Sequence, residues 1–474
     1  MKHRPLEPDA ATLDLLTSAC VAFVRAHVLS LAEQPSADLE GATALAATFR
    51  EAVPENGASI DSLLARLGPA IAKSFNTAGP GYLAFIPGGG IPTAALADYI
   101  ALSVNRYVGV TKAAPALAEI ERTAIRWLAD LMGLPASARG VLTSGGSISN
   151  FIALVTARTD RLPEDFLRGT IYVSDQTHLS MAKAARFAGF PAKNVRSVAV
   201  DARLRLDPAA LERAIADDRA RGLTPFFVCA NVGTTNTGAI DPIPDILEIA
   251  ARERLWVHAD AAYGGFFRLV PEGRALMPDV ERCDSITLDP HKGLFLPYGT
   301  GCLLVRDGEA LRRAHEGDAA YLADVASDDG VANFTDLSPE LSRDFRGLRL
   351  WLPLKLHGAH AFRVELSEKL ALARSAYDAL VADGRFEILD EPQLSVVAFR
   401  LRAKGGMSKG DADALNTELL RRVNARGRVF LSSTVLGGRL TLRICVLSFR
   451  THDDRVRDAI DGLRAEATSL LGEG

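Results

Sequence analysis

Apolar residues recur at helical spacing in the first part of the chain. They do so over residues 13–31 and again in "ASIDSLLARLGPAIAKSF", where Ser59 or Asp61 can serve as the N-cap. The next segment, "NTAGPGYLAFIPGGGIPT", has no periodicity, and three successive glycines at residues 88–90 suit neither a regular helix nor a regular strand. These glycines indicate either a mobile turn or a point where the backbone closely approaches another group.

Short apolar runs alternate with amphipathic helical patterns in the middle of the chain. From about residue 116, strand-like runs such as "GTIYVSD", "PFFVCANVG" and "LWVHADAA" are separated by helical stretches such as "DPAALERAIADDRARG". This pattern is typical of a mostly parallel sheet with helices on both faces. After about residue 360, a long helix leads into alternating strands and more helices. We therefore predict an N-terminal helical segment (residues 1–80), a large α/β domain (81–360) and a small C-terminal α+β domain (361–474).

Composition narrows the classes of function. A net charge of −4 on 474 residues gives no electrostatic reason to bind nucleic acid or an anionic membrane surface. The five cysteines are odd in number and form no CxxC pair, so they indicate neither a disulfide framework nor a metal site. The N-terminus lacks the apolar region of a signal peptide, and no run of about 18 uninterrupted apolar residues occurs. We expect a cytoplasmic protein without a membrane span.

The stretch "LTSGGSISNFIALVTAR" follows a strand-like run and opens a helix. Its small residues let the backbone approach a ligand, and a helix N-terminus offers unpaired N–H groups and a positive dipole end. Ser144, Ser147 and Ser149 add hydroxyl groups. The pattern suggests a site for a single phosphate, although an ordinary Ser/Gly N-cap would explain the stretch equally well.

Three residues farther along the chain suggest chemistry. Asp260 ends an apolar strand, where its carboxylate could pair with a cationic group or simply cap the next turn. His178 follows another strand and could stack on an aromatic ring or be structural. Lys292, in "ITLDPHKGLFLP", has the apolar surroundings of a nucleophilic amine, but alone it would pass for a surface lysine. Together with a phosphate cradle, these residues meet the needs of pyridoxal 5'-phosphate (PLP).

Several stretches resemble, in the same order, the group II PLP-dependent decarboxylases, the family of aromatic amino acid and glutamate decarboxylases. They are "GYLAFIPGG", "PALAEIERTAIRWLADLMGLP", "LTSGGSISN", "YVSDQTHLSMAKAA", "GTTNTGAIDPI", "WVHADAAYGG" and "DPHKG". The resemblance covers roughly residues 15–460. It implies a fold type I (aspartate aminotransferase-like) large domain and an L-amino acid decarboxylase. The implied reaction passes through an external aldimine and a quinonoid to give an amine and CO2.

The resemblance also assigns roles to residues. It implies that Lys292 forms the Schiff base with PLP, that Asp260 keeps the pyridine nitrogen protonated and that His178 stacks on the ring. It further implies a homodimer with active sites at the interface and N-terminal helices exchanged between subunits. The remaining cofactor contacts that it implies are Gly146, Ser147, Thr234, Ala262 and His291.

The chain departs from the family pattern at the lysine motif and in the segments that line the substrate pocket. The family often has Asn where Asp289 stands, and a bulky residue where Gly293 stands. An acid is a poor neighbour for phosphate unless it turns away or meets a cation. Phe85 and Tyr107 are candidates for substrate contact, but the pocket pattern does not name the amino acid.

The family's loop tyrosine, which protonates the carbanion left by CO2, has no certain counterpart. Counting back from Trp351 places Phe334 at that position, and Tyr321 lies thirteen residues earlier. In relatives, phenylalanine at this position accompanies oxidative deamination to an aldehyde, although Phe334 could simply pack the loop. An aldehyde synthase that consumes O2 is therefore an alternative. A second alternative is another fold type I enzyme, such as an aminotransferase or aldolase, in which Arg443 would bind the substrate carboxylate. The third alternative is a binding module that carries out no reaction.

Overall fold

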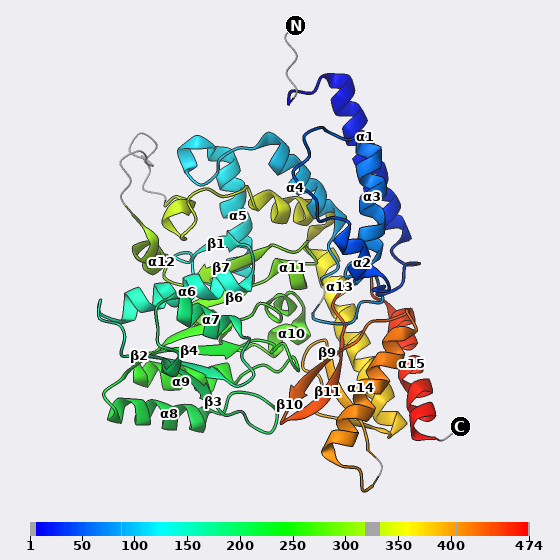
Figure 1. Ribbon diagram of the computed structural model, residues 1–474. Coiled ribbons are helices and arrows are strands. Elements are labelled where there is room, and N and C mark those ends of the chain that lie inside the picture. Colours follow the sequence, from blue (N-terminus) through cyan, green and yellow to red (C-terminus); the bar gives the residue numbers. More distant parts are fainter. Residues whose placement is uncertain (1–5, 87, 318–331, 404, 473–474) are drawn as a thin grey trace.

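The structure, a computed structural model, describes residues 6–86, 88–317, 332–403 and 405–472 (Figure 1). Its N-terminal part is helical, as predicted, with α1 (Ala10–Ser30), α2 (Ala42–Ala47) and α3 (Ile60–Ala72). Ser59 is the N-cap of α3, since its side chain accepts a hydrogen bond from the backbone N–H of Ser62. Helices α1 and α3 lie side by side at one edge of the molecule (Figure 1).

Helix α1 leaves its apolar side chains uncovered. None of its residues is buried, and by length and composition it is apolar enough to cross a membrane. A single such helix near an N-terminus is weak evidence for a span, because a surface that binds another protein chain has the same character. The absence of a membrane span therefore stays a prediction.

A seven-stranded sheet forms the centre of the large α/β part. Its strand order is β1-β7-β6-β5-β4-β2-β3, and all neighbours are parallel except at β7, which runs antiparallel to both β1 and β6. Strands β2, β4, β5 and β6 are almost wholly buried, which explains why the sequence reads as continuous apolar runs. The strands are β1 (Arg139–Thr143), β2 (Gly169–Ser174), β3 (Val195–Val198), β4 (Thr224–Asn231), β5 (Trp256–Asp260), β6 (Ser285–Leu288) and β7 (Gly301–Val305).

Helices cover this sheet, and one of them positions the site. Helix α6 packs on β1, β4, β5, β6 and β7, and it starts directly after β1. Its N-terminus therefore lies at the edge where the parallel strands end. The helices of this part are α4 (Pro92–Val104), α5 (Pro115–Leu131), α6 (Gly146–Arg161), α7 (Ser180–Phe187), α8 (Pro208–Ala220), α9 (Ile243–Glu253), α10 (Pro271–Ala275), α11 (Pro290–Gly293) and α12 (Gly308–His315).

The C-terminal part has its own antiparallel sheet, in the order β10-β11-β9-β8, and its own hydrophobic cluster. Helix α13 (Gly347–Asp383) links the two sheets and is kinked at Gly358, where φ is 71°. That kink lies close to the predicted boundary at residue 360, and the division into three domains stays a prediction. The other elements are β8 (Phe386–Ile388), β9 (Val396–Leu401), α14 (Lys409–Ala425), β10 (Ser432–Leu436), β11 (Arg439–Cys445) and α15 (Asp453–Leu471).

The glycine-rich segment at residues 88–90 packs tightly against other parts of the chain. A Cβ atom on Gly88 would lie 2.0 Å from the carbonyl oxygen of His291, and one on Gly89 would lie 2.5 Å from the Ser448 hydroxyl. The glycines thus serve close backbone approach, one of the two alternatives that the sequence left open. They hold this segment against the turn that carries Lys292.

Candidate active site

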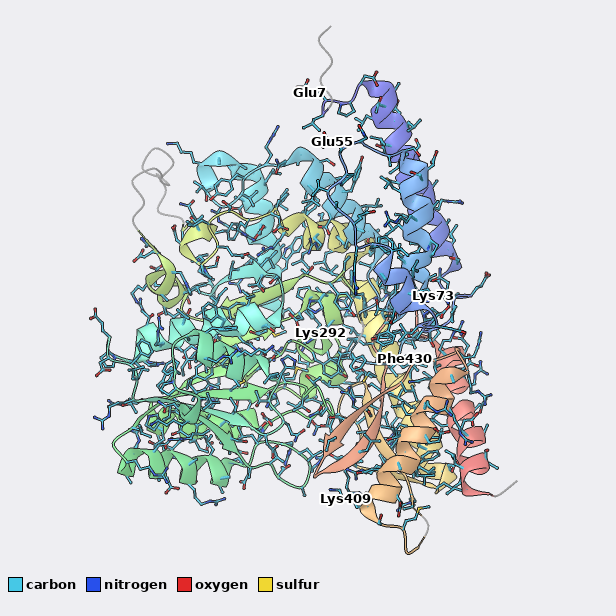
Figure 2. All side chains as sticks on the ribbon, viewed as in Figure 1. Glu7, Glu55, Lys73, Lys292, Lys409 and Phe430 are labelled. Atoms are coloured by element: carbon cyan, nitrogen blue, oxygen red, sulfur yellow. The ribbon has the colours of Figure 1, made fainter. Side chains whose placement is uncertain are left out.

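A cavity of about 320 Å³ lies where the parallel strands of the large sheet end. Its walls come from the start of α6, from the segments after β2, β4 and β5, and from α11. Figure 2 shows the lysine of α11 near the centre of the molecule. The structure brings together in this cavity every predicted cofactor contact: Gly146, Ser147, His178, Thr234, Asp260, Ala262, His291 and Lys292.

Asp260 presents a carboxylate at the floor of the cavity and is only 8% exposed. Its Oδ2 accepts a hydrogen bond from Asn150 Nδ2 at 2.9 Å, and its Oδ1 accepts one from the backbone N–H of Ala262 at 3.2 Å. Both neighbours donate, so the carboxylate is held in place by two hydrogen bonds. The side chain can therefore hold a positively charged group at the cavity wall.

Lys292 lies on the short helix α11 and pairs with the acid that precedes it in the motif. Its Nζ is 3.0 Å from Asp289 Oδ2. Asp289 is 3% exposed, and its Oδ1 has no hydrogen-bond partner among the described residues. His291 Nδ1 donates to the carbonyl of Thr300 at 2.7 Å, which leaves Nε2 facing Asp289 Oδ2 at 3.7 Å. The unusual acid thus does meet a cation, which offsets its negative charge.

The start of α6 has the shape of an anion cradle. Gly145 has a φ of 151°, and a Cβ on Gly146 would come within 3.1 Å of Asp289 Oδ2 and 3.4 Å of Ala262 Cβ. A larger residue would fill the space in front of the first N–H groups, which have no partner within the helix. Ser144 and Ser147 line the cavity, but Ser149 is buried and bonds Thr143 instead.

His178 reaches the cavity from the segment after β2. Its Nδ1 contacts the Ser180 hydroxyl at 2.9 Å. Desolvation by the surrounding protein lowers the pKa of His178, and the charge of Asp260 opposes that shift, although the ring stays open to solvent on the cavity side. A neutral imidazole beside Asp260 and Lys292 is a flat surface on which an aromatic ring can stack.

The site fits PLP on the chemistry of its groups. It offers an amine for the aldehyde, a carboxyl group for the pyridine nitrogen, an imidazole for the ring and glycine-lined N–H groups for the phosphate. Asp289 is the one group that suits a phosphate poorly, and its Oδ2 lies 3.0 Å from the same Lys292 amine that would take up the aldehyde.

Of the predicted substrate and loop residues, Phe85, Tyr107 and Phe334 do not line this cavity. Phe85 is 56% exposed and has a positive φ of 54°. The Tyr107 hydroxyl donates to the carbonyl of Leu341 at 2.9 Å. Tyr321 lies outside the described residues. Arg443 donates to the carbonyl of Thr235 at 2.6 Å and does not line the cavity, which removes the placement expected of a substrate-carboxylate arginine.

Phe334 packs in the hydrophobic core of the large part. It is 2% exposed, and the guanidinium groups of Arg343 and Arg122 lie 4.8 and 5.7 Å from its ring centre. It lines a different cavity, between α5, β1 and α12. In the single chain, the residue reached by counting back from Trp351 therefore does not line the cavity that holds Lys292.

Among the polar residues near the cavity that the sequence analysis missed are Asn150, Ser180 and His258. Asn150 and Ser180 line the cavity, and His258 is fully buried behind it. Their positions in the sequence could have indicated them. Asn150 interrupts the apolar face of α6, and His258 precedes Asp260 by two residues on one strand. In a strand, residues two apart point to the same side of the sheet.

Comparisons with known proteins agree with this geometry. The matching family is described as a pyridoxal-dependent decarboxylase conserved domain and spans residues 43–402. An aromatic-L-amino-acid decarboxylase of Bacillus atrophaeus is 32% identical over 467 residues, which cover 98% of this chain and 97% of the relative. The crystal structure of Oryza sativa TDC with PLP and tryptamine has a TM-score of 0.94 at 33% identity, covering 99% of this chain and 100% of that chain. The crystal structure of Rhodiola rosea 4-hydroxyphenylacetaldehyde synthase has a TM-score of 0.89 at 25% identity, covering 98% of this chain and 99% of that chain. The fold alone does not separate amine from aldehyde as the product.

Proposed function

This chain belongs to the family of pyridoxal-dependent decarboxylases, and on that premise we propose that it converts aromatic L-amino acids into the corresponding amines and CO2. Its general activity, PLP-dependent decarboxylation of an amino acid, follows from the family. The finer proposal concerns the substrate class, the product, the residue roles and the assembly. The observation that carries the residue roles is the convergence of Lys292, Asp260 and His178 on one cavity.

The chain's own residues have distinct tasks in this proposal. Bound PLP supplies an aldehyde that captures the substrate amine and a ring that accepts the electron pair left by CO2. Lys292 anchors the cofactor and releases it to the substrate. Asp260 holds a proton at the pyridine nitrogen, which keeps the ring electron-poor. His178 and Ala262 would hold the ring, and the start of α6 would bind the phosphate through backbone N–H groups.

We propose the amine as product because Phe334 is not placed to govern protonation. Its ring is packed in the core beside two arginines and lines a different cavity from Lys292. Of the two loop candidates, Tyr321 then remains as the proton donor to Cα. Amine formation converts the amino acid into amine and CO2. The aldehyde route would also consume O2 and water and release ammonia and hydrogen peroxide.

A matched pair of variants tests this choice. Tyr321→Phe is expected to divert a measurable share of turnover to aldehyde, ammonia and peroxide, because the carbanion then lacks its proton donor and can react with O2. Phe334→Tyr is expected to leave the product ratio unchanged. The measurement is amine, aldehyde and peroxide per CO2 released. A wild-type enzyme that forms stoichiometric aldehyde and peroxide would contradict the proposed product.

The aromatic substrate class rests on relatives, namely an aromatic-L-amino-acid decarboxylase and TDC crystallised with tryptamine. Phe85 and Tyr107 are exposed in the single chain, and we assign them to a substrate pocket completed by a second subunit. We expect tryptophan, tyrosine, phenylalanine, DOPA or 5-hydroxytryptophan to give the highest kcat/KM among common amino acids. A preference for glutamate would contradict the assignment, and CO2 release across the amino acid panel measures it.

We also propose that the enzyme is a homodimer with α1 at its interface. Apolar side chains on α1, among them Val21 and Val24, are more than half exposed, and further apolar residues are exposed on α3 and α4. A monomer rarely exposes so much apolar surface, and a partner chain would cover it. The exposed free thiol of Cys20 on the same helix is compatible with a reducing compartment, so we place the enzyme in the cytoplasm.

A charge introduced on α1 tests the dimer. Val21→Glu is expected to shift the protein from dimer toward monomer, since a carboxylate would be buried without a partner. Val435→Glu is the control, because Val435 is similarly exposed on β10 and distant from α1 in the sequence. Sedimentation analysis without detergent measures the mass. A wild-type chain that is monomeric, or that needs detergent to stay in solution, would contradict the proposal.

A further inference from the structure

A chain of buried hydrogen bonds runs from Trp256 to the acid of the cofactor site. Trp256 Nε1 and His258 Nδ1 each lie 2.8 Å from the Ser285 hydroxyl. His258 Nε2 lies 3.0 Å from Asn150 Oδ1, and Asn150 Nδ2 lies 2.9 Å from Asp260 Oδ2. Four of these side chains are at most 2% exposed, and Asp260 is 8% exposed, so water does not compete for the bonds.

The positions of the protons follow from the carboxylate of Asp260. It accepts from Asn150 Nδ2, so the amide oxygen of Asn150 faces His258 Nε2, which must carry a proton to donate to it. Complete burial lowers the pKa of His258 to about 4, so the ring is neutral near pH 7 and its Nδ1 is an acceptor. The Ser285 hydroxyl donates to that nitrogen, and the Ser285 oxygen accepts from the indole N–H of Trp256. The Thr287 hydroxyl lies 3.4 Å from the same Nε2.

Asn150 is therefore fixed with its NH2 group toward the cofactor site. One amide hydrogen goes to Asp260 Oδ2 and the other to the Ser180 hydroxyl at 3.0 Å. The backbone N–H of Ser180 donates to His178 Nδ1 at 3.2 Å, which makes that nitrogen an acceptor. The Ser180 hydroxyl, which accepts from Asn150, can donate to the same nitrogen at 2.9 Å. One amide thus orients both the acid and the imidazole.

We propose that Asn150 is a positioning residue that keeps Asp260 aimed at the pyridine nitrogen, and that His258, Ser285 and Trp256 support the direction of its amide. This inference rests on the proposed role of Asp260. Turned by 180°, the amide would place its oxygen against the carboxylate and its NH2 against the Nε2–H of His258. Both contacts would be repulsive, so the buried chain excludes the wrong orientation.

The test uses Asn150→Leu, which keeps the approximate shape of the side chain and removes its hydrogen bonds. The variant is reconstituted with PLP carrying ¹⁵N in the ring, and NMR reports whether the ring nitrogen is protonated. We expect a smaller protonated fraction and a kcat about ten- to hundredfold lower, since a hydrogen bond to a charged group is lost. Thr156→Val is the control, because Thr156 is a buried hydroxyl of the same helix outside this chain and should match the wild type.

Ser285→Ala is the second variant, and it decides the question if Asn150→Leu fails to fold. It removes the hydroxyl that contacts His258 Nδ1 and leaves Asn150 in place, so we expect the same change in smaller measure. The proposal would be overturned if the folded variants had the same protonated fraction of the ring nitrogen and the same kcat as the wild type. The ring-nitrogen signal requires only bound cofactor. A chain that binds PLP but decarboxylates nothing would thus refute the proposed function without deciding this inference.

Discussion

Lys292→Ala is expected to abolish decarboxylation, with a loss on the order of 10⁴-fold or more, the scale seen when a covalent catalytic group is removed. The ammonium lies in the cofactor cavity, 3.0 Å from Asp289 and 24% exposed, so it is reachable by the PLP aldehyde. Without it, the variant should lose the visible absorbance of lysine-bound cofactor. Borohydride reduction followed by peptide mass spectrometry should find the cofactor on Lys292 in the wild type and on no residue in the variant.

The control for this variant is Lys409→Ala, an exposed lysine at the start of α14 in the C-terminal part (Figure 2). It should retain both the cofactor absorbance and the rate. An active Lys292→Ala enzyme, or a reduced cofactor attached to another lysine, would refute the assignment of the cavity as the cofactor site.

The broad architecture could be predicted because burial leaves a clear mark on the sequence. Strands such as β4 and β5 are covered on both faces, so they appear as apolar runs between amphipathic helices. The direction of β7 could not be predicted in this way. An antiparallel strand buried on both faces has the same composition as a parallel one, and only its pairing with β1 and β6 distinguishes it.

Site residues that lie at the ends of strands could be predicted from the sequence. Residues whose position depends on side-chain packing could not. Asp260 ends β5 and Lys292 lies on α11, shortly after β6, so the sheet itself brings them together. Phe334 was chosen by its distance from Trp351 along the chain, and that distance carries no information about the side of the fold it enters. Its position follows from Arg343, whose guanidinium pairs with the buried Glu121 and lies against the ring.

Asn150 shows a different limit of sequence patterns. A single asparagine within a helix is usually an exposed or structural residue, and nothing near it in the sequence links it to Asp260, 110 positions away. Its role depends on hydrogen-bond donors and acceptors from β5, β6 and α7, and these elements meet only in the folded chain. By contrast, the departure at Asp289 was visible in the motif, and only its partner, Lys292, required the structure.

Asp260→Asn is expected to lower kcat on the order of 10²- to 10³-fold, the usual cost of removing one preorganised electrostatic group from an active site. The amide has the shape of the carboxylate but cannot hold a proton at the pyridine nitrogen, so the ring would accept the electron pair from CO2 loss less readily. The cofactor should remain attached to Lys292, because the phosphate cradle and the amine are unchanged. Substrate KM should change little, since the lost interaction acts on the transition state.

The separation of rate from cofactor binding makes this variant informative. Steady-state kinetics at saturating PLP, together with the absorbance of bound cofactor, distinguish a chemical defect from a loss of cofactor. Asp390→Asn, which removes one charge from the exposed pair with Arg203, is the control and should match the wild type. An Asp260→Asn enzyme with more than about a tenth of the wild-type kcat would be inconsistent with the cost of losing such a group. The acid would then be an anchor for Asn150 and Ala262, and the electron demand of the ring would have to be maintained by other groups of the cavity.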